Sequence, residues 1–126
     1  MITGITFGVF DYTHIGHINL MKNAKKHCDL LIVCASDDEY VEKKKGHKPT
    51  FTLKERMDAL KELESVDLVD VQSLYFGKKE LINKYKPEII FVGDDWNEKT
   101  FEGSDLGVEV KFLPRTKKIS STKMRG

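Results

Sequence analysis

The chain has 126 residues, and its 21 basic side chains against 20 acidic ones leave a net charge of +1. This length predicts a single domain over residues 1–126, and the balanced charge argues against a general nucleic-acid-binding surface. No apolar run approaches the roughly 18 residues that a membrane span requires, and the N-terminus lacks a secretory signal pattern. Cys28 and Cys34 have neither metal-ligand nor disulfide-framework spacing. We therefore expect a cytoplasmic protein with two reduced, buried cysteines and no membrane partner.

The first half of the chain alternates apolar runs with amphipathic stretches. Residues 2–7 predict a short buried strand, and residues 16–27 predict a helix with an apolar stripe that includes Met21. Residues 30–35 form a continuous apolar run, which is typical of a parallel strand covered on both faces. The charged residues 37–48 show no clear period, so we expect a loop there.

The second half continues the alternation. Thr52 and Glu55 form a capping box, which predicts that a helix begins there. The other expected elements are, in chain order, a strand at 66–71, a helix at 78–85 stopped by Pro87, strands at 88–92 and 108–113, and a short final helix capped by Ser120 or Ser121. The strand at 108–113 alternates apolar with charged residues, so we expect it to be half exposed or at a sheet edge.

Strands that alternate with helices predict an α/β domain with a mostly parallel sheet. Ligands of such sheets bind beyond the carboxyl ends of the strands. Three distinctive segments directly follow expected strands, at residues 8–17, 93–96 and 115–122. We therefore expect these segments to converge in one site.

The segment after the first strand has the composition of a phosphate-binding site. Gly8 and Gly16 stand where the backbone must approach a ligand closely, and His14 and His17 lie three residues apart at the start of a helix. Free N–H groups at a helix start and two imidazoles can bind one phosphoryl group. Two alternatives stay open: a metal site with Asp11 as a further ligand, and a purely structural role for both histidines.

Two basic segments could bind further phosphates. The Lys43–Lys48 run is either a solvated loop or a basic loop that closes over a triphosphate. Arg115, followed by Ser120 and Ser121, is either a second anion site or an ordinary capped terminal helix. Neither a P-loop nor a dinucleotide-binding fingerprint is present. Two phosphate sites without an obvious catalytic base favour transfer of a nucleotidyl group to an acceptor that is itself a phosphate.

These segments resemble the cytidylyltransferase-like nucleotidyltransferases, whose signature is H-x-G-H after the first strand. The resemblance rests on Gly8-x-Phe10-Asp11-x-x-His14-x-Gly16-His17, on Gly93-Asp94-Asp95-Trp96 and on Pro114-Arg115-Thr116-x-x-Ile119-Ser120-Ser121-Thr122. Within that family, the order and spacing are similar to those of bacterial enzymes that act on glycerol 3-phosphate. The resemblance implies a Rossmann-like three-layer α/β/α sandwich with a five-stranded sheet, and a homodimer. It also implies a Mg²⁺-dependent reaction of CTP with sn-glycerol 3-phosphate to CDP-glycerol and pyrophosphate, which would feed teichoic-acid or capsule synthesis.

The resemblance also assigns roles to individual residues. His14 and His17 would contact the CTP phosphates and stabilise the transition state, and Lys44 would bridge the nucleotide and acceptor phosphates. Arg115 would be the fourth catalytic residue. The other nucleotide-binding residues would be Gly8, Val9, Phe10, Gly16, Gly93, Asp95, Thr116, Ser120 and Ser121, and the substrate-binding residues would be Asp11, Lys44, Arg56 and Tyr75.

The chain departs from the pattern of the glycerol-phosphate enzymes at three positions. Val9 replaces a threonine, Tyr75 replaces a tryptophan, and Glu64 stands where those enzymes carry an arginine. The change at Glu64 bears on the acceptor more than on CTP, so another small phosphorylated alcohol is an alternative acceptor. An ATP-dependent adenylyltransferase, a non-catalytic nucleotide-binding module and a metal-dependent phosphohydrolase are the rival functions.

Overall fold

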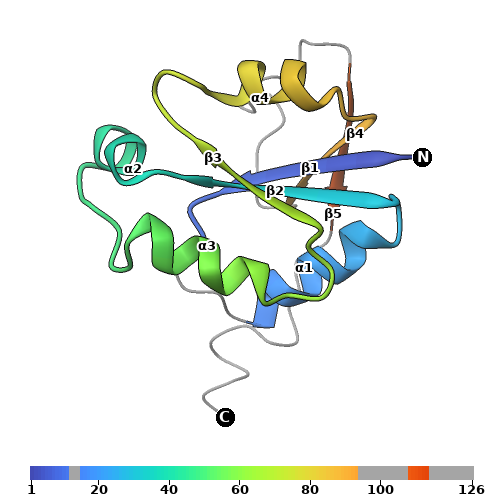
Figure 1. Ribbon diagram of the computed structural model, residues 1–126, viewed down its shortest axis with the longest axis horizontal. Helices are drawn as coiled ribbons and strands as arrows, with labels where there is room; N and C mark the ends of the chain where they lie inside the picture. Colours follow the sequence, from blue (N-terminus) through green and yellow to red (C-terminus); the bar gives the residue numbers. More distant parts are fainter. Residues whose placement is uncertain (12–14, 94–107, 114–126) are drawn as a thin grey trace.

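The computed structural model describes residues 1–11, 15–93 and 108–113, and Figure 1 shows them as one sheet with helices on both faces. The elements are β1 (Thr3–Gly8), α1 (Ile15–Lys25), β2 (Leu30–Ser36), α2 (Asp38–Lys45), α3 (Leu53–Lys61), β3 (Leu68–Gln72), α4 (Lys78–Tyr85), β4 (Ile89–Gly93) and β5 (Glu109–Leu113). In the described part of the chain, no helix is long and apolar enough to cross a membrane.

All five strands are parallel and lie in the order β3-β2-β1-β4-β5. The chain therefore fills one half of the sheet with β1, β2 and β3, and then crosses to the other side of β1 to add β4 and β5. The winding direction therefore reverses between β1 and β4, which are neighbours in the sheet. A crevice outside the carboxyl ends at such a switch point is where ligands bind in doubly wound sheets.

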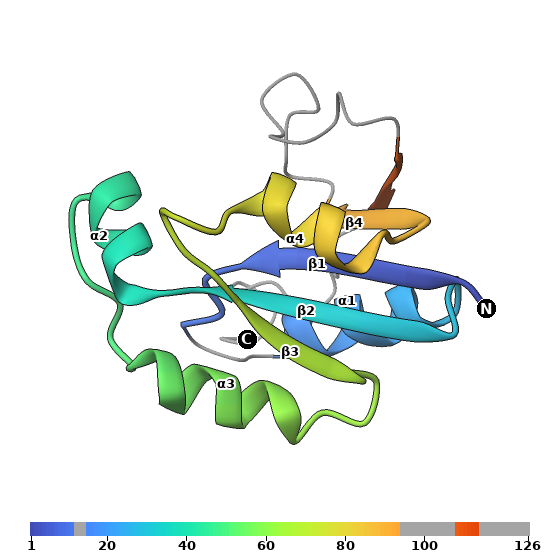
Figure 2. The ribbon, with the colours of Figure 1, turned by 45° about the horizontal axis from the view of Figure 1, so that its top comes forward.

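The two faces of the sheet bury separate apolar clusters. Helices α1 and α3 cover one face, where Met21, Ala24 and Leu60 pack against Leu31 and Val33. Helix α4 covers the other face, and its packing includes Leu81, Ile82, Ile5, Ile32 and Ile90. Alternate residues of β2 thus point to opposite clusters, as the two-residue period of a strand requires. Figure 2 shows the resulting three layers, which confirm the expected α/β/α sandwich.

The expected elements are confirmed within two residues at most of their bounds, with one exception. The expected loop at 37–48 is wrong, because most of it is helix α2. The Asp37 carboxylate accepts a hydrogen bond from the Tyr40 amide at the start of this helix, and Gly46 ends it with φ 83°. Only Val41 is buried, so the helix has too few apolar residues to show a period. The expected final helix at Ser120 or Ser121 lies outside the described residues.

Other expectations about individual residues are also confirmed. The capping box at Thr52 and Glu55 is formed at the start of α3, and β5 is an edge strand. Cys28 and Cys34 are free and buried. Burial, and then the Asp70 carboxylate, raise the pKa of the Cys34 thiol, which keeps it protonated and unreactive.

Leu60 provides a test of how much the α3 face of the sandwich contributes. Its side chain is fully buried, whereas Leu68 at the start of β3 is 40% exposed. We expect Leu60→Ala to lower the free energy of unfolding by about 2–5 kcal/mol, because it removes transfer energy and leaves a cavity. Urea unfolding followed by circular dichroism measures this change. Leu68→Ala is the matched control, and equal losses for the two variants would contradict the assigned packing.

Candidate functional site

The residues at the carboxyl end of β1 position His17, one of the two signature histidines, through the ring of Phe10. Phe10 is buried although its φ is 54°, a conformation that bulky residues rarely adopt. A Cβ on Gly8 would lie 2.8 Å from the Phe10 ring, so only glycine lets this ring pack where it does. The ring of Phe10 then meets His17 edge-on, with centroids 5.3 Å apart and planes at 78°. This packing fixes the His17 imidazole near the start of α1.

Asp11 holds the loop that connects α2 with α3. Its two carboxylate oxygens accept hydrogen bonds from the amides of Thr50, at 2.7 Å, and of Phe51, at 2.8 Å. Partial burial pushes the pKa of Asp11 upward, but these hydrogen bonds and the charge of Arg56 outweigh it, so the pKa lies below its ordinary value. Asp11 is therefore a structural anchor in this structure, and its expected contact with the acceptor stays a prediction.

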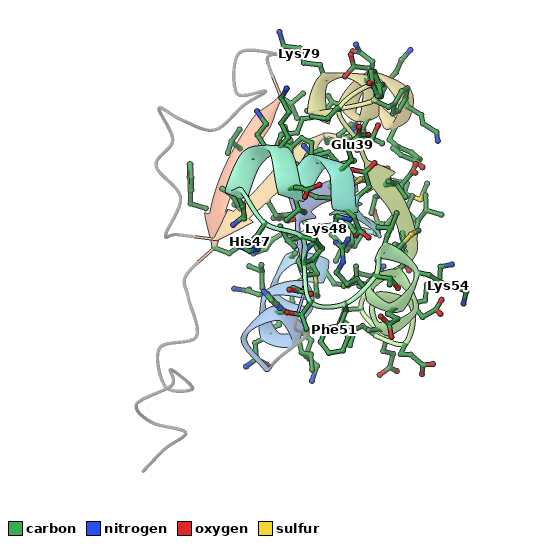
Figure 3. The ribbon with its side chains drawn as sticks, turned by 90° about the vertical axis from the view of Figure 1, so that its left-hand side faces the viewer. Glu39, His47, Lys48, Phe51, Lys54 and Lys79 are labelled. Carbon is green, nitrogen blue, oxygen red and sulfur yellow. The ribbon has the colours of Figure 1, made fainter. Side chains whose placement is uncertain are left out.

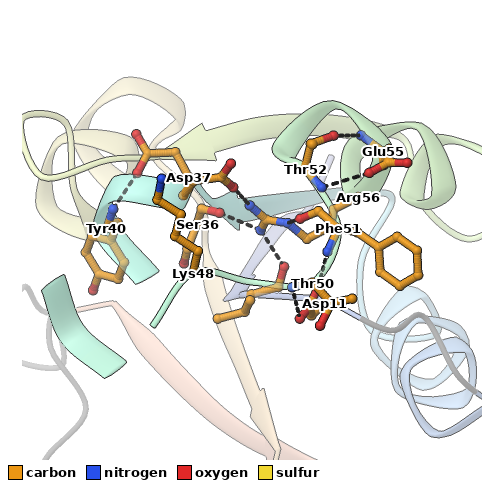
Figure 4. Close-up of polar contacts among 12 residues, drawn as sticks. Asp11, Ser36, Asp37, Tyr40, Lys48, Thr50, Phe51, Thr52, Glu55 and Arg56 are labelled. Atoms are coloured by element: carbon orange, nitrogen blue, oxygen red, sulfur yellow. Dashed lines mark hydrogen bonds and ion pairs between the residues drawn. The ribbon is translucent and has the colours of Figure 1, made fainter. Parts of the chain in front are cut away.

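Arg56 is buried in α3, and its side chain points toward the ends of β1 and β2 (Figure 4). The guanidinium donates hydrogen bonds to the carbonyl oxygens of Phe51, Val9 and Ser36 and to the carboxylate of Asp38. All four of these acceptors belong to the protein. The expected substrate contact of Arg56 stays a prediction, and Val9 contributes its carbonyl oxygen to this network.

Helix α2 carries basic residues to the carboxyl edge of the sheet. Figure 3 looks onto this edge, where α2 crosses in front of the sheet and the loop with His47, Lys48 and Phe51 runs from it to α3. Tyr40 and Lys44 are four residues apart on the helix, so they share a face. The ammonium nitrogen of Lys44 lies 5.7 Å from the centroid of the Tyr40 ring.

The structure adds Lys78 to the candidate site, a residue that the sequence analysis missed. Lys78 opens α4 and is only 8% exposed. Its ammonium nitrogen lies 5.7 Å from the centroid of the Tyr40 ring and 5.6 Å from that of Phe7. Two lysines therefore lie near one tyrosine ring, and the N-terminus of α4 adds the positive end of its dipole beside Lys78. The signal in the sequence was a lysine at the first position of the helix expected at 78–85.

The remaining expected residues are spread more widely. Gly16 lies in the first turn of α1, and Gly93 ends β4. Tyr75 is 84% exposed in the turn between β3 and α4. Glu64 is exposed in the turn between α3 and β3, so within one chain it lies at the amino edge of the sheet, away from the other candidates. Outside the described residues lie His14, Asp95, Arg115, Thr116, Ser120 and Ser121.

No group of three or more histidine, cysteine, aspartate or glutamate side chains among the described residues is arranged to hold a metal ion. The site as described is therefore an aromatic and cationic surface around the ends of β1, β2 and β3. Together with the doubly wound sheet, it defines the class of protein: a Rossmann-like α/β domain whose carboxyl edge, where such sheets bind ligands, carries lysine side chains.

Comparison with known proteins identifies the family. The chain belongs to the cytidylyltransferase-like family, whose model matches residues 5–126. It is 37% identical over 121 residues to "Glycerol-3-phosphate cytidylyltransferase" of Bacillus subtilis, which covers 96% of this chain and 92% of that protein. It is 38% identical over 107 residues to "FAD synthase" of Thermococcus sibiricus, which covers 85% of this chain and 70% of that protein.

A solved structure supports the same conclusion. The lipopolysaccharide core biosynthesis protein from Thermoplasma volcanium superposes with a TM-score of 0.75 at 30% identity, covering 92% of this chain and 97% of that one. Family and fold thus agree with the resemblance read from the motifs, and the chain is a nucleotidyltransferase.

The lowered pKa of Asp11 predicts how stability depends on pH. A depressed pKa in the folded state stabilises the fold above the unfolded value of about 3.9 and loses this effect as pH falls through the folded value. We expect Asp11→Asn to be less stable than the natural chain at pH 6 and to differ from it much less at pH 3. Urea midpoints at both values measure this, with Glu39→Gln as the control on an exposed carboxylate. A difference between the Asp11→Asn variant and the natural chain that does not change with pH would contradict the anchoring role.

Proposed function

We propose that this chain transfers the cytidylyl group of CTP to a small phosphorylated alcohol, with glycerol 3-phosphate as the first candidate, and releases pyrophosphate. The observation that carries the proposal is the 37% identity to the Bacillus subtilis glycerol-3-phosphate cytidylyltransferase over nearly the whole of both chains. The relative from Staphylococcus aureus with the same name covers 96% of this chain at 34% identity. The product would be a CDP-alcohol, which is CDP-glycerol for this acceptor.

The proposed reaction needs no catalytic base. A phosphate monoester has a second pKa of about 6, so the acceptor arrives largely ionised at neutral pH. One of its oxygens attacks the α-phosphorus of CTP and forms the new phosphorus–oxygen bond. The bond from the α-phosphorus to the bridging oxygen breaks, and pyrophosphate leaves with the electron pair. The protein has to align the two phosphates and stabilise the added negative charge.

The residues of the site divide this work. His17, whose ring packs on Phe10 near the start of α1, is expected to donate a hydrogen bond to a phosphoryl oxygen, with His14 as its expected partner. Lys44 and Lys78, both near the Tyr40 ring, would supply two positive charges at the same edge of the sheet. Arg115, Thr116, Ser120 and Ser121 are expected to bind the β- and γ-phosphates, and Gly93 and Asp95 to frame the nucleoside.

The proposal includes a Mg²⁺-dependent reaction, a homodimer and a cytoplasmic location. Mg²⁺ commonly keeps several waters and binds through substrate phosphates, so we expect the ion to enter with the triphosphate and reduce its charge. The homodimer follows from the resemblance to the glycerol-phosphate enzymes.

An ATP-dependent adenylyltransferase is the second candidate, because relatives named FAD synthase are as similar in sequence. FAD contains an adenylyl group, so a relative of such an enzyme could use ATP. Pyrophosphate release decides between the two when the purified chain is given Mg²⁺, CTP or ATP, and a panel of phosphorylated alcohols and FMN. Turnover with CTP and glycerol 3-phosphate supports the proposal in full, and turnover with CTP and another alcohol relocates only the acceptor. Turnover with ATP alone, or with no pair, contradicts it.

His17 tests the proposed chemistry directly. We expect His17→Ala to lower kcat/KM by about two orders of magnitude or more, as loss of a hydrogen bond to a developing charge does. His27→Ala is a matched control, since His27 is exposed just beyond the other end of α1. Steady-state pyrophosphate release with circular dichroism of both variants makes the measurement. A folded His17→Ala variant with nearly full activity would refute the assignment.

A further inference from the structure

We propose that Arg56 is a positioning residue that sets helix α2, and with it Lys44, relative to the loop that ends β1. For its kinetic consequence this inference rests on the proposed function, but its structural part does not. On this proposal, an arginine is needed at this position for its contacts within the protein and not for a contact with substrate.

The guanidinium joins the chain after β1, the stretch from the end of β2 to the start of α2, and the loop before α3 (Figure 4). One terminal nitrogen, Nη1, donates to the carbonyl oxygens of Val9, at 2.8 Å, and Ser36, at 2.5 Å, which follow or end β1 and β2. The other, Nη2, lies 2.6 Å from a carboxylate oxygen of Asp38. The Nε atom donates to the carbonyl oxygen of Phe51 at 3.1 Å. A planar fork with fixed donors suits these diverging acceptors, and a lysine could not reproduce it.

The ion pair with Asp38 is the contact through which Arg56 fixes the position of α2. The Arg56 side chain is fully buried, and Asp38, the first residue of α2, is the carboxylate paired with it among the described residues. A buried charge that loses its partner is strongly unfavourable, so the pair holds the N-terminus of α2 close to the sheet.

Helix α2 has few other means of keeping its place. It has eight residues and buries only Val41, so apolar packing contributes little. The other polar contacts near its start include the Asp37 amide, which donates to the carbonyl oxygen of Gln72, and the Tyr40 hydroxyl, which accepts a hydrogen bond from Lys78 at 3.4 Å. The position of α2 therefore depends on a few polar contacts, and in the Arg56–Asp38 ion pair the guanidinium is fully buried whereas the Asp38 side chain is 43% exposed.

The contacts of Arg56 act on two parts of the candidate site, helix α2 and the backbone after β1. Through Asp38, Arg56 sets α2 and the Tyr40–Lys44 face that the helix presents. Through the Val9 carbonyl oxygen, it holds the backbone directly before Phe10, whose ring packs on His17. Loss of the first link should displace Lys44 alone, whereas loss of the guanidinium should disturb Lys44 and His17 together.

The variants Asp38→Asn and Arg56→Lys separate these links. Asp38→Asn keeps the shape but removes the charge, and it leaves the three carbonyl contacts of Arg56 intact. Asp58→Asn is the matched control, because Asp58 is also an aspartate paired with a cation, Lys54, on the exposed side of α3. Three readouts apply to each: hydrogen exchange of the α2 amides, the imidazole NMR signals of His17, and kcat and KM for pyrophosphate release.

We expect Asp38→Asn to speed exchange of the α2 amides by about tenfold or more relative to α4, with unchanged His17 signals. Its kcat/KM should fall about tenfold, and this fall should vanish when Lys44 is already alanine, because both changes act through one side chain. Arg56→Lys should alter both α2 exchange and the His17 signals. Asp58→Asn should change none of the three.

Two results would overturn the proposal. One is a hydrogen-exchange rate of the α2 amides in Asp38→Asn that equals the rate in the natural chain. The other is a kinetic loss that persists undiminished in the Lys44→Ala background, which would give Asp38 or Arg56 a direct contact with substrate. Exchange and NMR use the free protein, so they decide the positioning role even if no nucleotide supports turnover, a result that would defeat the proposed function alone. Should Arg56→Lys fail to fold, Asp38→Asn still decides.

Discussion

The buried guanidinium of Arg56 is the contact on which the arrangement of the site depends. A parallel sheet brings the carboxyl ends of its strands to one edge, but it does not fix the loops and short helix that leave that edge. Arg56 binds the backbone after β1, the end of β2, the start of α2 and the loop before α3. A charge buried at this point makes the contacts mutually dependent, because each acceptor helps to replace the water that the guanidinium has lost.

Asp11 extends this network and explains why two residues expected at the substrate make their contacts within the protein. The Asp11 carboxylate accepts hydrogen bonds from the backbone amides of Thr50 and Phe51, and the Arg56 guanidinium donates one to the carbonyl oxygen of the same Phe51. The loop between α2 and α3 is thus held from both sides by opposite charges. Motif residues can therefore contribute to a site by holding its loops in position, as well as by contacting the ligand.

The sequence was sufficient for the sheet and most helices because their signals are local. Continuous apolar runs predict buried parallel strands, and the capping box at Thr52 predicts the start of α3 to the residue. Helix α2 was not predicted because its only buried residue is Val41, so it shows no apolar period. Asp37, the acidic first turn and Gly46 are nevertheless ordinary helix-end signals. The contacts of Arg56 and Lys78 depend on segments that meet only in the folded chain, so no spacing rule could reveal them.

The chemistry also explains why relatives of this family can differ in substrate while keeping one site. If the attacking phosphate is already ionised, the reacting atoms need alignment and positive charge, and these needs are the same for any attached alcohol. In the proposed reaction, His17, Lys44 and Lys78 would meet these needs without recognising the alcohol itself. Specificity then has to arise beside this common centre, in segments such as the exposed turn with Tyr75. This division is consistent with a chain that is equally similar to relatives named for glycerol 3-phosphate and for FAD.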